Sequence, residues 1–264
     1  MDLVLQGTMN NYTIEIANHY LNLDFVNNII ISCWDIDKHN VENLNNKIKI
    51  IYNNNEVKNS GITNRNRQII TSINGLKNVS TKYSVKLRSD QKISLDSMIL
   101  MYNYYEKNKE RDLHYENNLS KPLNKICVAG IFKAFPFHPR DHIFWGNTED
   151  LIDLFSLPLD ELLMSGNPLS NEEYKKYTRS ELYIAIHYCK YFNNKINLFI
   201  ENYKEYLVDD APKINEAFEL SEKILNKIFL PFPKINFEWP KHGLKEYHYH
   251  LTEGPDYKEV FGEL

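Results

Sequence analysis

Several features that mark other protein classes are scarce or missing in this sequence. It has three cysteines, an odd number spread widely along the chain, so a framework of disulfides is not expected. The strongest apolar run, residues 29–34, is far too short to cross a bilayer. The first residues, MDLVLQG, lack the basic and long apolar regions of a signal peptide. These absences lead us to expect a reduced, cytoplasmic protein.

The sequence also lacks an excess of positive charge. Its formal net charge is -4 at pH 7, and its basic residues are scattered without a long basic run. A broad nucleic-acid-binding surface is therefore not expected, and no nucleic-acid partner is predicted. No GxSxG, Walker A loop, HExxH or GxGxxG occurs in the chain. Serine-hydrolase, P-loop and dinucleotide-enzyme interpretations thus lose most of their support.

Residues 1–90 alternate between strand-like and helix-like segments. Asn10 or Asn11 can cap the first helix. Such alternation favours a mainly parallel sheet with helices on both faces, joined by right-handed crossovers. Before residue 61 the pattern predicts strands at 3–5, 29–33 and 48–52, helices near 10–21 and 41–46, and a polar loop at 53–60.

The next unit, residues 64–90, reads NRNRQIITSINGLKNVSTKYSVKLRSD. Apolar residues between Ile62 and Leu76 recur every three or four positions, which predicts a helix. Residues 83–88 then alternate apolar and polar, which predicts a strand. The strand ends at Arg88-Ser89-Asp90, and in open α/β sheets this carboxyl edge is where ligands bind. An ordinary αβ unit with a solvated charged end is the alternative.

The pattern changes after Asp90. Ser94 can cap a helix, and three later apolar runs have no helix between them, so they should pair as antiparallel or mixed strands. These runs are residues 125–131, 133–137 and 143–145, and further helices are predicted at 148–155, 180–192 and 214–229. We expect one domain over residues 1–264, with a nucleotide-binding half at 1–90, an acceptor half at 91–178, and a helical extension and tail at 179–264.

One set of polar residues can meet in a single crevice. The first and fourth strands of the predicted sheet end at the same edge, which brings Gly7 and Asp90 together. Glycine lets the main chain approach a ligand closely, and nearby cations could neutralise a diphosphate. Each residue alone also has a structural explanation, as a turn or a surface charge. The predicted nucleotide-binding set is Gln6, Gly7, Thr8, Asn66, Arg67, Lys86, Arg88 and Asp90.

A second set lies in residues 137–146, FHPRDHIFWG. Aromatic residues flank its charges, and apolar surroundings can raise the pKa of a carboxylate toward that of a useful base. Asp141 is therefore the candidate general base. His138 and His142 could form half of a metal site, although no Cys or His pair at zinc spacing completes it. Glu149 and Asp150, which follow, are explained more simply as acids at the start of a helix.

Four segments resemble a known family. VLQGT, IIISCWD, the block at residues 64–90 and FHPRDHIFWGNTEDL together resemble the WavE family of lipopolysaccharide-synthesis proteins. That family carries a QG near the N-terminus, a Ser-x-Trp after the second strand, an NRQI block, a K-x-R-x-D and a later aromatic-rich segment with an Asp. The resemblance covers residues 2 to about 155, and Val79 departs from it where a small residue is more usual.

The resemblance implies a fold and an activity. Members of the family are regarded as glycosyltransferases with a GT-A-like, Rossmann-like fold, here with mixed strands in the second half and a helical C-terminal part. The chain would move a sugar from a nucleotide-sugar donor to a glycan or lipid-linked glycan acceptor of lipopolysaccharide or capsule. Asp141 would deprotonate the acceptor hydroxyl, which favours inversion, and His138 and His142 would bind the acceptor. A lipid-linked acceptor would bring the protein transiently to the inner membrane.

The resemblance also raises the question of a metal. Large inverting glycosyltransferase families end the corresponding strand in Asp-x-Asp, but Arg88 occupies the first acidic position here. Either Asp90 alone binds a divalent Mn²⁺ or Mg²⁺ ion, which we expect, or Arg88 and Lys86 neutralise the diphosphate instead. Two other functions stay open: transfer of another nucleotide-activated group such as a polyol phosphate, and a non-catalytic subunit that binds nucleotide or glycan.

Overall fold

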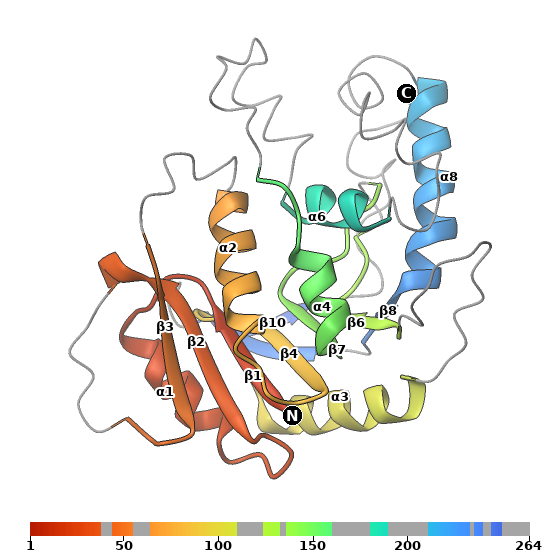
Figure 1. Cartoon of the computed structure of the whole chain (residues 1–264). Helices are drawn as coiled ribbons and strands as arrows, with labels where there is room; N and C mark the ends of the chain where they lie inside the picture. The colour runs from red at the N-terminus through yellow and green to blue at the C-terminus, as the bar shows by residue number, and fades with distance from the viewer. Residues whose placement is uncertain are drawn as a thin grey trace.

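The described part of the chain forms three layers, with a mostly parallel sheet between two layers of helices (Figure 1). This computed structural model describes residues 1–37, 44–54, 64–109, 124–132, 136–159, 180–189, 211–232, 235–239 and 244–249. The sheet has seven strands in the order β3-β2-β1-β4-β7-β6-β8. The α/β architecture predicted from the alternating pattern is confirmed.

Four parallel strands make up the first half of the sheet. β1 lies between β2 and β4, with Leu5 opposite both Ile31 and Leu87. Every residue of β1 is buried, because packed elements cover both faces of the sheet, and its centre, residues 3–5, is a continuous apolar run. The strands are β1 (Asp2–Gln6), β2 (Asn28–Trp34), β3 (Ile48–Asn53) and β4 (Tyr83–Arg88).

The second half of the sheet has mixed directions, as predicted. β7 (Ile143–Asn147) pairs antiparallel with β4, and β6 (Ile126–Val128) pairs antiparallel with β7. β8 (Phe229–Pro231), which was not predicted, pairs parallel with β6. The predicted strand at 133–137 is wrong at its end: residues 133–135 lie outside the described residues, and 136–137 form a turn in which Phe137 has φ 52°.

Helices cover both faces of the sheet (Figure 1). Side chains of Asn10, Ser94 and Asn147 accept hydrogen bonds at the starts of α1, α3 and α4, which stabilises these helix ends. α1 (Asn11–Tyr20) and α3 (Leu95–Asn108) pack on one face; α2 (Arg65–Leu76), α4 (Thr148–Phe155), α6 (Ser180–Cys189) and α8 (Ala211–Ile228) pack on the other. None of the described helices is long and apolar enough to span a bilayer.

Two parts of the predicted element order differ from the structure. The helix predicted at 41–46 is not seen: residues 41–43 lie outside the described residues, and residues 44–46 are not helical. β2 is followed instead by a 3-10 turn, η1 (Asp35–Asp37). The region predicted as a polar tail contains β10 (Leu244–Tyr249), which pairs with β9 (Ile235–Trp239). β9 in turn pairs with β5 (Lys92–Ile93) to make a small second sheet.

Close packing of α2 against the sheet positions the start of that helix. A Cβ added to Gly75 would lie 2.5 Å from Val4 Cγ1 and 3.0 Å from Ser32 Cβ. Only glycine lets α2 approach β1 and β2 this closely. The first turn of α2 is thereby held over the carboxyl edge of the sheet, where the loops after β1 and β4 also lie.

Candidate functional site

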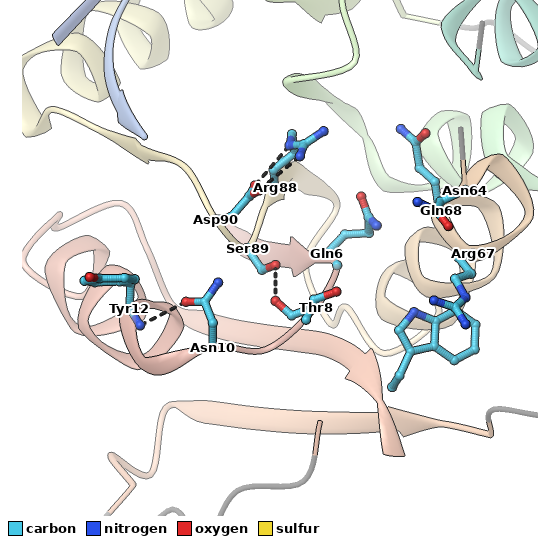
Figure 2. Close-up of a pocket in the computed structure, with 12 residues that line it drawn as sticks. Gln6, Thr8, Asn10, Tyr12, Asn64, Arg67, Gln68, Arg88, Ser89 and Asp90 are labelled. Atoms are coloured by element: carbon cyan, nitrogen blue, oxygen red, sulfur yellow. Dashed lines mark hydrogen bonds and ion pairs between the residues drawn. The ribbon is translucent and has the colours of Figure 1, made fainter. Parts of the chain in front are cut away.

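The carboxyl ends of β1 and β4 mark the point where the strand order reverses. From β1 the chain moves outward to β2 and β3 and then returns to place β4 on the other side of β1. In open α/β sheets the loops diverge at such a point and leave a crevice that binds ligands. A cavity of about 450 Å³ lies here (Figure 2). It is lined by Gln6, Gly7, Thr8, Asn10, Tyr12, Trp34, Asn64, Arg67, Gln68, Arg88, Ser89 and Asp90.

Six of the eight residues predicted to bind a nucleotide line this cavity, and Gly7 shapes its floor. The φ of Gly7 is 134°, a conformation that residues with a side chain rarely adopt, and its N–H donates to the Ser32 carbonyl at 3.1 Å. The loop after β4 is bonded to the loop after β1: Ser89 N–H donates to the Gln6 carbonyl at 2.9 Å, and Ser89 Oγ donates to the Thr8 carbonyl at 2.8 Å. The six lining residues are Gln6, Gly7, Thr8, Arg67, Arg88 and Asp90.

Two helices begin at the cavity. Asn10, the N-cap of α1, and Asn64, the N-cap of α2, both line it. Asn64 has a left-handed φ of 60°, and its side chain makes no capping hydrogen bond within the described structure. Helix N-termini carry partial positive charge, so both ends favour a bound anion.

The charged side chains of the cavity are Arg67, Arg88 and Asp90. Arg88 Nε and Nη2 donate to Asp90 Oδ1 and Oδ2, each at 3.0 Å, in a bidentate pair (Figure 2). The guanidinium of Arg67 lies 5.6 Å from the centre of the Trp34 ring. A guanidinium has five N–H donors in a planar fork, a geometry that suits phosphate as well as carboxylate.

The residues present do not fit a resident divalent cation. Both carboxylate oxygens of Asp90 already accept from Arg88, and the arginine stands where a second acid would be needed. Among the described residues no group of three His, Cys, Asp or Glu side chains is placed to bind a metal. Mg²⁺ and Mn²⁺ prefer several carboxylate, carbonyl or water oxygens, whereas a guanidinium repels them. Asp90 as a metal ligand therefore stays a prediction that this geometry does not favour.

Lys86 and Asn66, also predicted to bind nucleotide, lie outside the cavity lining. Asn66 is buried in the first turn of α2. Lys86 is fully buried, and its Nζ donates to the main-chain carbonyl of Asp141 at 3.0 Å and faces the rings of Phe144 and Phe155. Burial lowers the pKa of Lys86 to about 8. Lys86 thus interacts with Asp141 and does not line the cavity, and its role in binding a nucleotide stays a prediction.

The structure places Asp141 behind Gln68. Gln68 Nε2 donates to Asp141 Oδ2 at 2.7 Å, and only Gln68 of the two lines the cavity. Burial would raise the pKa of Asp141, but the charges of Lys86 and Arg88 outweigh it, so the pKa falls to about 2. The expectation of a raised pKa is therefore wrong, because the aromatic segment packs against a buried lysine.

His138 and His142 contact different partners. The Nε2 atom of buried His138 lies 3.5 Å from Glu181 Oε1 on α6. His142 Nδ1 instead lies 2.9 Å from Gln91 Nε2, and its ring packs on Phe237 of the small sheet. Burial lowers the pKa of His142 to about 4. The binding of the acceptor by His138 and His142 stays a prediction, and neither residue lines the cavity.

Several residues of the cavity were not predicted from the sequence. Trp34 lies in the IIISCWD segment and Gln68 in the NRQI block, so only the resemblance to the family could have indicated that these two residues belong to the site. Tyr12, with 44% of its surface exposed, had no signal, because an aromatic residue in the first turn of a helix usually belongs to the core. The others are Asn10, Asn64 and Ser89.

The chain is similar to several solved structures at low identity. The 4-diphosphocytidyl-2C-methyl-D-erythritol synthase of Anaerococcus prevotii is 9% identical, with 69% of this chain and 84% of that chain covered and a TM-score of 0.39. The galactosyltransferase LgtC is 11% identical, with 74% of this chain and 71% of that chain covered and a TM-score of 0.39. TarS of S. aureus is 15% identical, with 71% of this chain and 32% of that chain covered and a TM-score of 0.36. These values are too low to carry a function to this chain. No curated protein matches it.

The match to a protein family is broader. Residues 26–204 match WavE, the family of lipopolysaccharide synthesis, which is more than half of the chain. The matched range includes the first turn of α2, the Arg88–Asp90 pair after β4, and Asp141. The chain therefore belongs to the WavE family of lipopolysaccharide synthesis.

Proposed function

We propose that this WavE protein is a glycosyltransferase that moves a sugar from a nucleotide-sugar donor to a lipopolysaccharide or capsule acceptor. The observation that carries the proposal is the cavity at the carboxyl ends of β1 and β4, where two arginines and two helix N-termini meet. A nucleoside diphosphate combines the negative charge and the size that such a cavity suits. Family membership supports lipopolysaccharide as the acceptor class.

Arg67 and Arg88 would hold the diphosphate of the donor. When the bond between sugar and phosphate breaks, the departing nucleotide gains negative charge, and fixed guanidinium groups stabilise that charge without reorganisation. The exposed ring of Tyr12 at the rim offers a face on which a nucleobase can stack. In this mechanism the arginines neutralise the diphosphate, as a divalent ion does in metal-dependent transferases, because the side chains around Asp90 do not fit a metal ion.

Asp141 would be the base that deprotonates the acceptor, with inversion at the sugar carbon. Its carboxylate is ionised at neutral pH, as a base must be, but a pKa of about 2 makes it a weak base. Gln68 also stands between Asp141 and the cavity. The acceptor hydroxyl would therefore have to reach Oδ1, the carboxylate oxygen of Asp141 that does not accept from Gln68, and a lipid-linked acceptor would reach the site from the inner membrane.

A thermal-shift panel tests the proposal. We expect nucleoside diphosphates and their sugars to raise the melting temperature of the wild type, and Arg88→Gln to abolish the rise. Lys77→Gln, an exposed change at the far end of α2, is the matched control. Stabilisation by CMP or CDP compounds alone would favour a sialic-acid-type or polyol-phosphate donor. The absence of any response to nucleotides would contradict the proposal and favour a glycan-binding subunit.

A further inference from the structure

Two glutamines in the cavity have amide groups whose orientation is set by their partners. Gln6 Nε2 lies 2.9 Å from Thr71 Oγ1 on α2. The Thr71 hydroxyl has one proton, which it donates to the Arg67 carbonyl one helical turn earlier at 2.7 Å. Thr71 can therefore only accept from Gln6, so the NH₂ group of Gln6 must face Thr71 and its carbonyl oxygen must face away.

The same reasoning fixes Gln68. Its Nε2 lies 2.7 Å from Asp141 Oδ2. Asp141 is held ionised by the neighbouring charges of Lys86 and Arg88, and an ionised carboxylate can only accept hydrogen bonds. The NH₂ group of Gln68 must therefore face Asp141, and the reverse orientation would place two acceptor oxygens in contact.

The carbonyl oxygens of both glutamines thus remain for a ligand. Gln6 and Gln68 line the cavity, and in the part of the chain that the structure describes neither carbonyl oxygen accepts a hydrogen bond. Both side chains are at most 9% exposed, so their rotamers are restricted before any ligand arrives. The cavity therefore offers two kinds of recognition: guanidinium donors for an anion, and two fixed acceptors for neutral donor groups.

We propose that the carbonyl oxygens of Gln6 and Gln68 accept hydrogen bonds from hydroxyl groups of the bound nucleotide sugar and so select its glycosyl part or its ribose. The inference rests on the proposed function, since it assigns a second recognition element to the same cavity. A ligand that carries phosphate without hydroxyl donors would satisfy the arginines and leave both carbonyl oxygens unpaired, which weakens its binding relative to a nucleotide sugar.

Titration calorimetry with three probes tests this. The probes are the nucleotide sugar that most stabilises the wild type in a panel of UDP, GDP, dTDP and ADP sugars, the matching nucleoside diphosphate, and inorganic pyrophosphate. We expect Gln6→Met and Gln68→Met, which keep the side-chain length but remove the acceptor, each to weaken nucleotide-sugar binding about tenfold. Pyrophosphate affinity should stay at the wild-type value, because the arginines are unchanged.

Two further variants complete the design. Thr71→Val removes the partner of the Gln6 amide without altering the cavity lining. It should therefore weaken binding of the nucleotide sugar less than Gln6→Met does, and the double variant should bind no more weakly than Gln6→Met alone. Gln91→Met is the matched control, since Gln91 is a buried glutamine that bonds to His142 and does not line the cavity. It should leave all three affinities unchanged.

The outcomes separate the two sources of hydroxyl groups. Weaker binding of the nucleotide sugar alone assigns the contact to the glycosyl part, and equal weakening of the nucleoside diphosphate assigns it to the ribose. Wild-type affinity for the nucleotide sugar in both methionine variants would overturn the inference and leave the proposed function intact, and so would an equal loss of pyrophosphate binding. If the wild type binds none of the nucleotide sugars, the proposed function fails and the inference fails with it.

Discussion

Gly7 and Ser89 are so close that a Cβ at position 7 would lie 2.8 Å from Ser89 Oγ. The same Oγ donates to the Thr8 carbonyl, so the loops after β1 and β4 are joined at the floor of the cavity. Neither loop can shift alone, because strand pairing fixes Gln6 opposite Arg88 just before them. The contact thus links the position of Arg88 to the conformation of Gly7.

Gly7→Ala should destabilise the protein and weaken nucleotide binding. An alanine at φ 134° is strained by about 1–3 kcal/mol, and its methyl group also meets Ser89 Oγ. Urea unfolding measures the first effect. Ser89→Ala in the same chain should restore part of the loss, because it removes the contact but not the backbone strain. Wild-type stability in Gly7→Ala would show that the loop can relax and that the two loops are not coupled.

Lys86 should make folding stability rise with pH in the alkaline range. Its pKa is about 8 in the folded protein and 10.5 when unfolded, so between these values the unfolded chain binds more protons. Stability therefore increases from pH 8 to 10.5, by about 3 kcal/mol relative to Lys86→Met. Urea unfolding of both proteins at several pH values checks this difference. Lys77→Met is the exposed control, and parallel curves for wild type and Lys86→Met would contradict the lowered pKa.

Asp141 should contribute stability that disappears in acid. Its folded pKa is about 2, below the ordinary 3.8, so the contribution is complete above pH 3.8 and is lost as the pH falls toward 2. Asp141→Asn should therefore lose about 2 kcal/mol at neutral pH and show a flatter acid limb in circular dichroism. Asp24→Asn, at an exposed position, should follow the wild type. An unchanged acid limb in Asp141→Asn would mean that Lys86 and Arg88 do not depress this pKa.

Most helices and strands of the fold followed from local pattern, and the pairing of distant strands did not. β1 to β4 and the helices beside them are read from periodicity within each segment, and the caps Asn10 and Ser94 were visible as residue types. β9, which reads INFEW, also alternates apolar and polar residues, but it was not predicted; its pairing with β5 joins Ile93 to Phe237, far along the chain. The sequence of a strand shows its alternation but not which distant strand it will pair with.

Parts of the candidate site could likewise be predicted from the sequence, and parts that depend on distant pairing could not. The rule that ligands bind at the carboxyl ends of strands predicted that Gly7 would meet Asp90. The pKa of Asp141 was predicted with the wrong sign, because Lys86 lies beside the aromatic segment only through the antiparallel pairing that sets it opposite Phe144. Gln68 was missed for a related reason: its role depends on Asp141, which follows much later in the chain.

In the proposed function, arginine side chains rather than a divalent ion bind the diphosphate of the donor. Titration calorimetry of the best nucleoside diphosphate in 1 mM EDTA (roughly the excess needed to remove Mn²⁺ and Mg²⁺) tests it most directly. We predict that the wild type binds without metal, that added Mn²⁺ changes the affinity less than about threefold, and that Arg88→Gln weakens it by roughly 10- to 100-fold. Binding that appears only when Mn²⁺ is added, or that keeps the wild-type affinity in Arg88→Gln, would contradict this proposal.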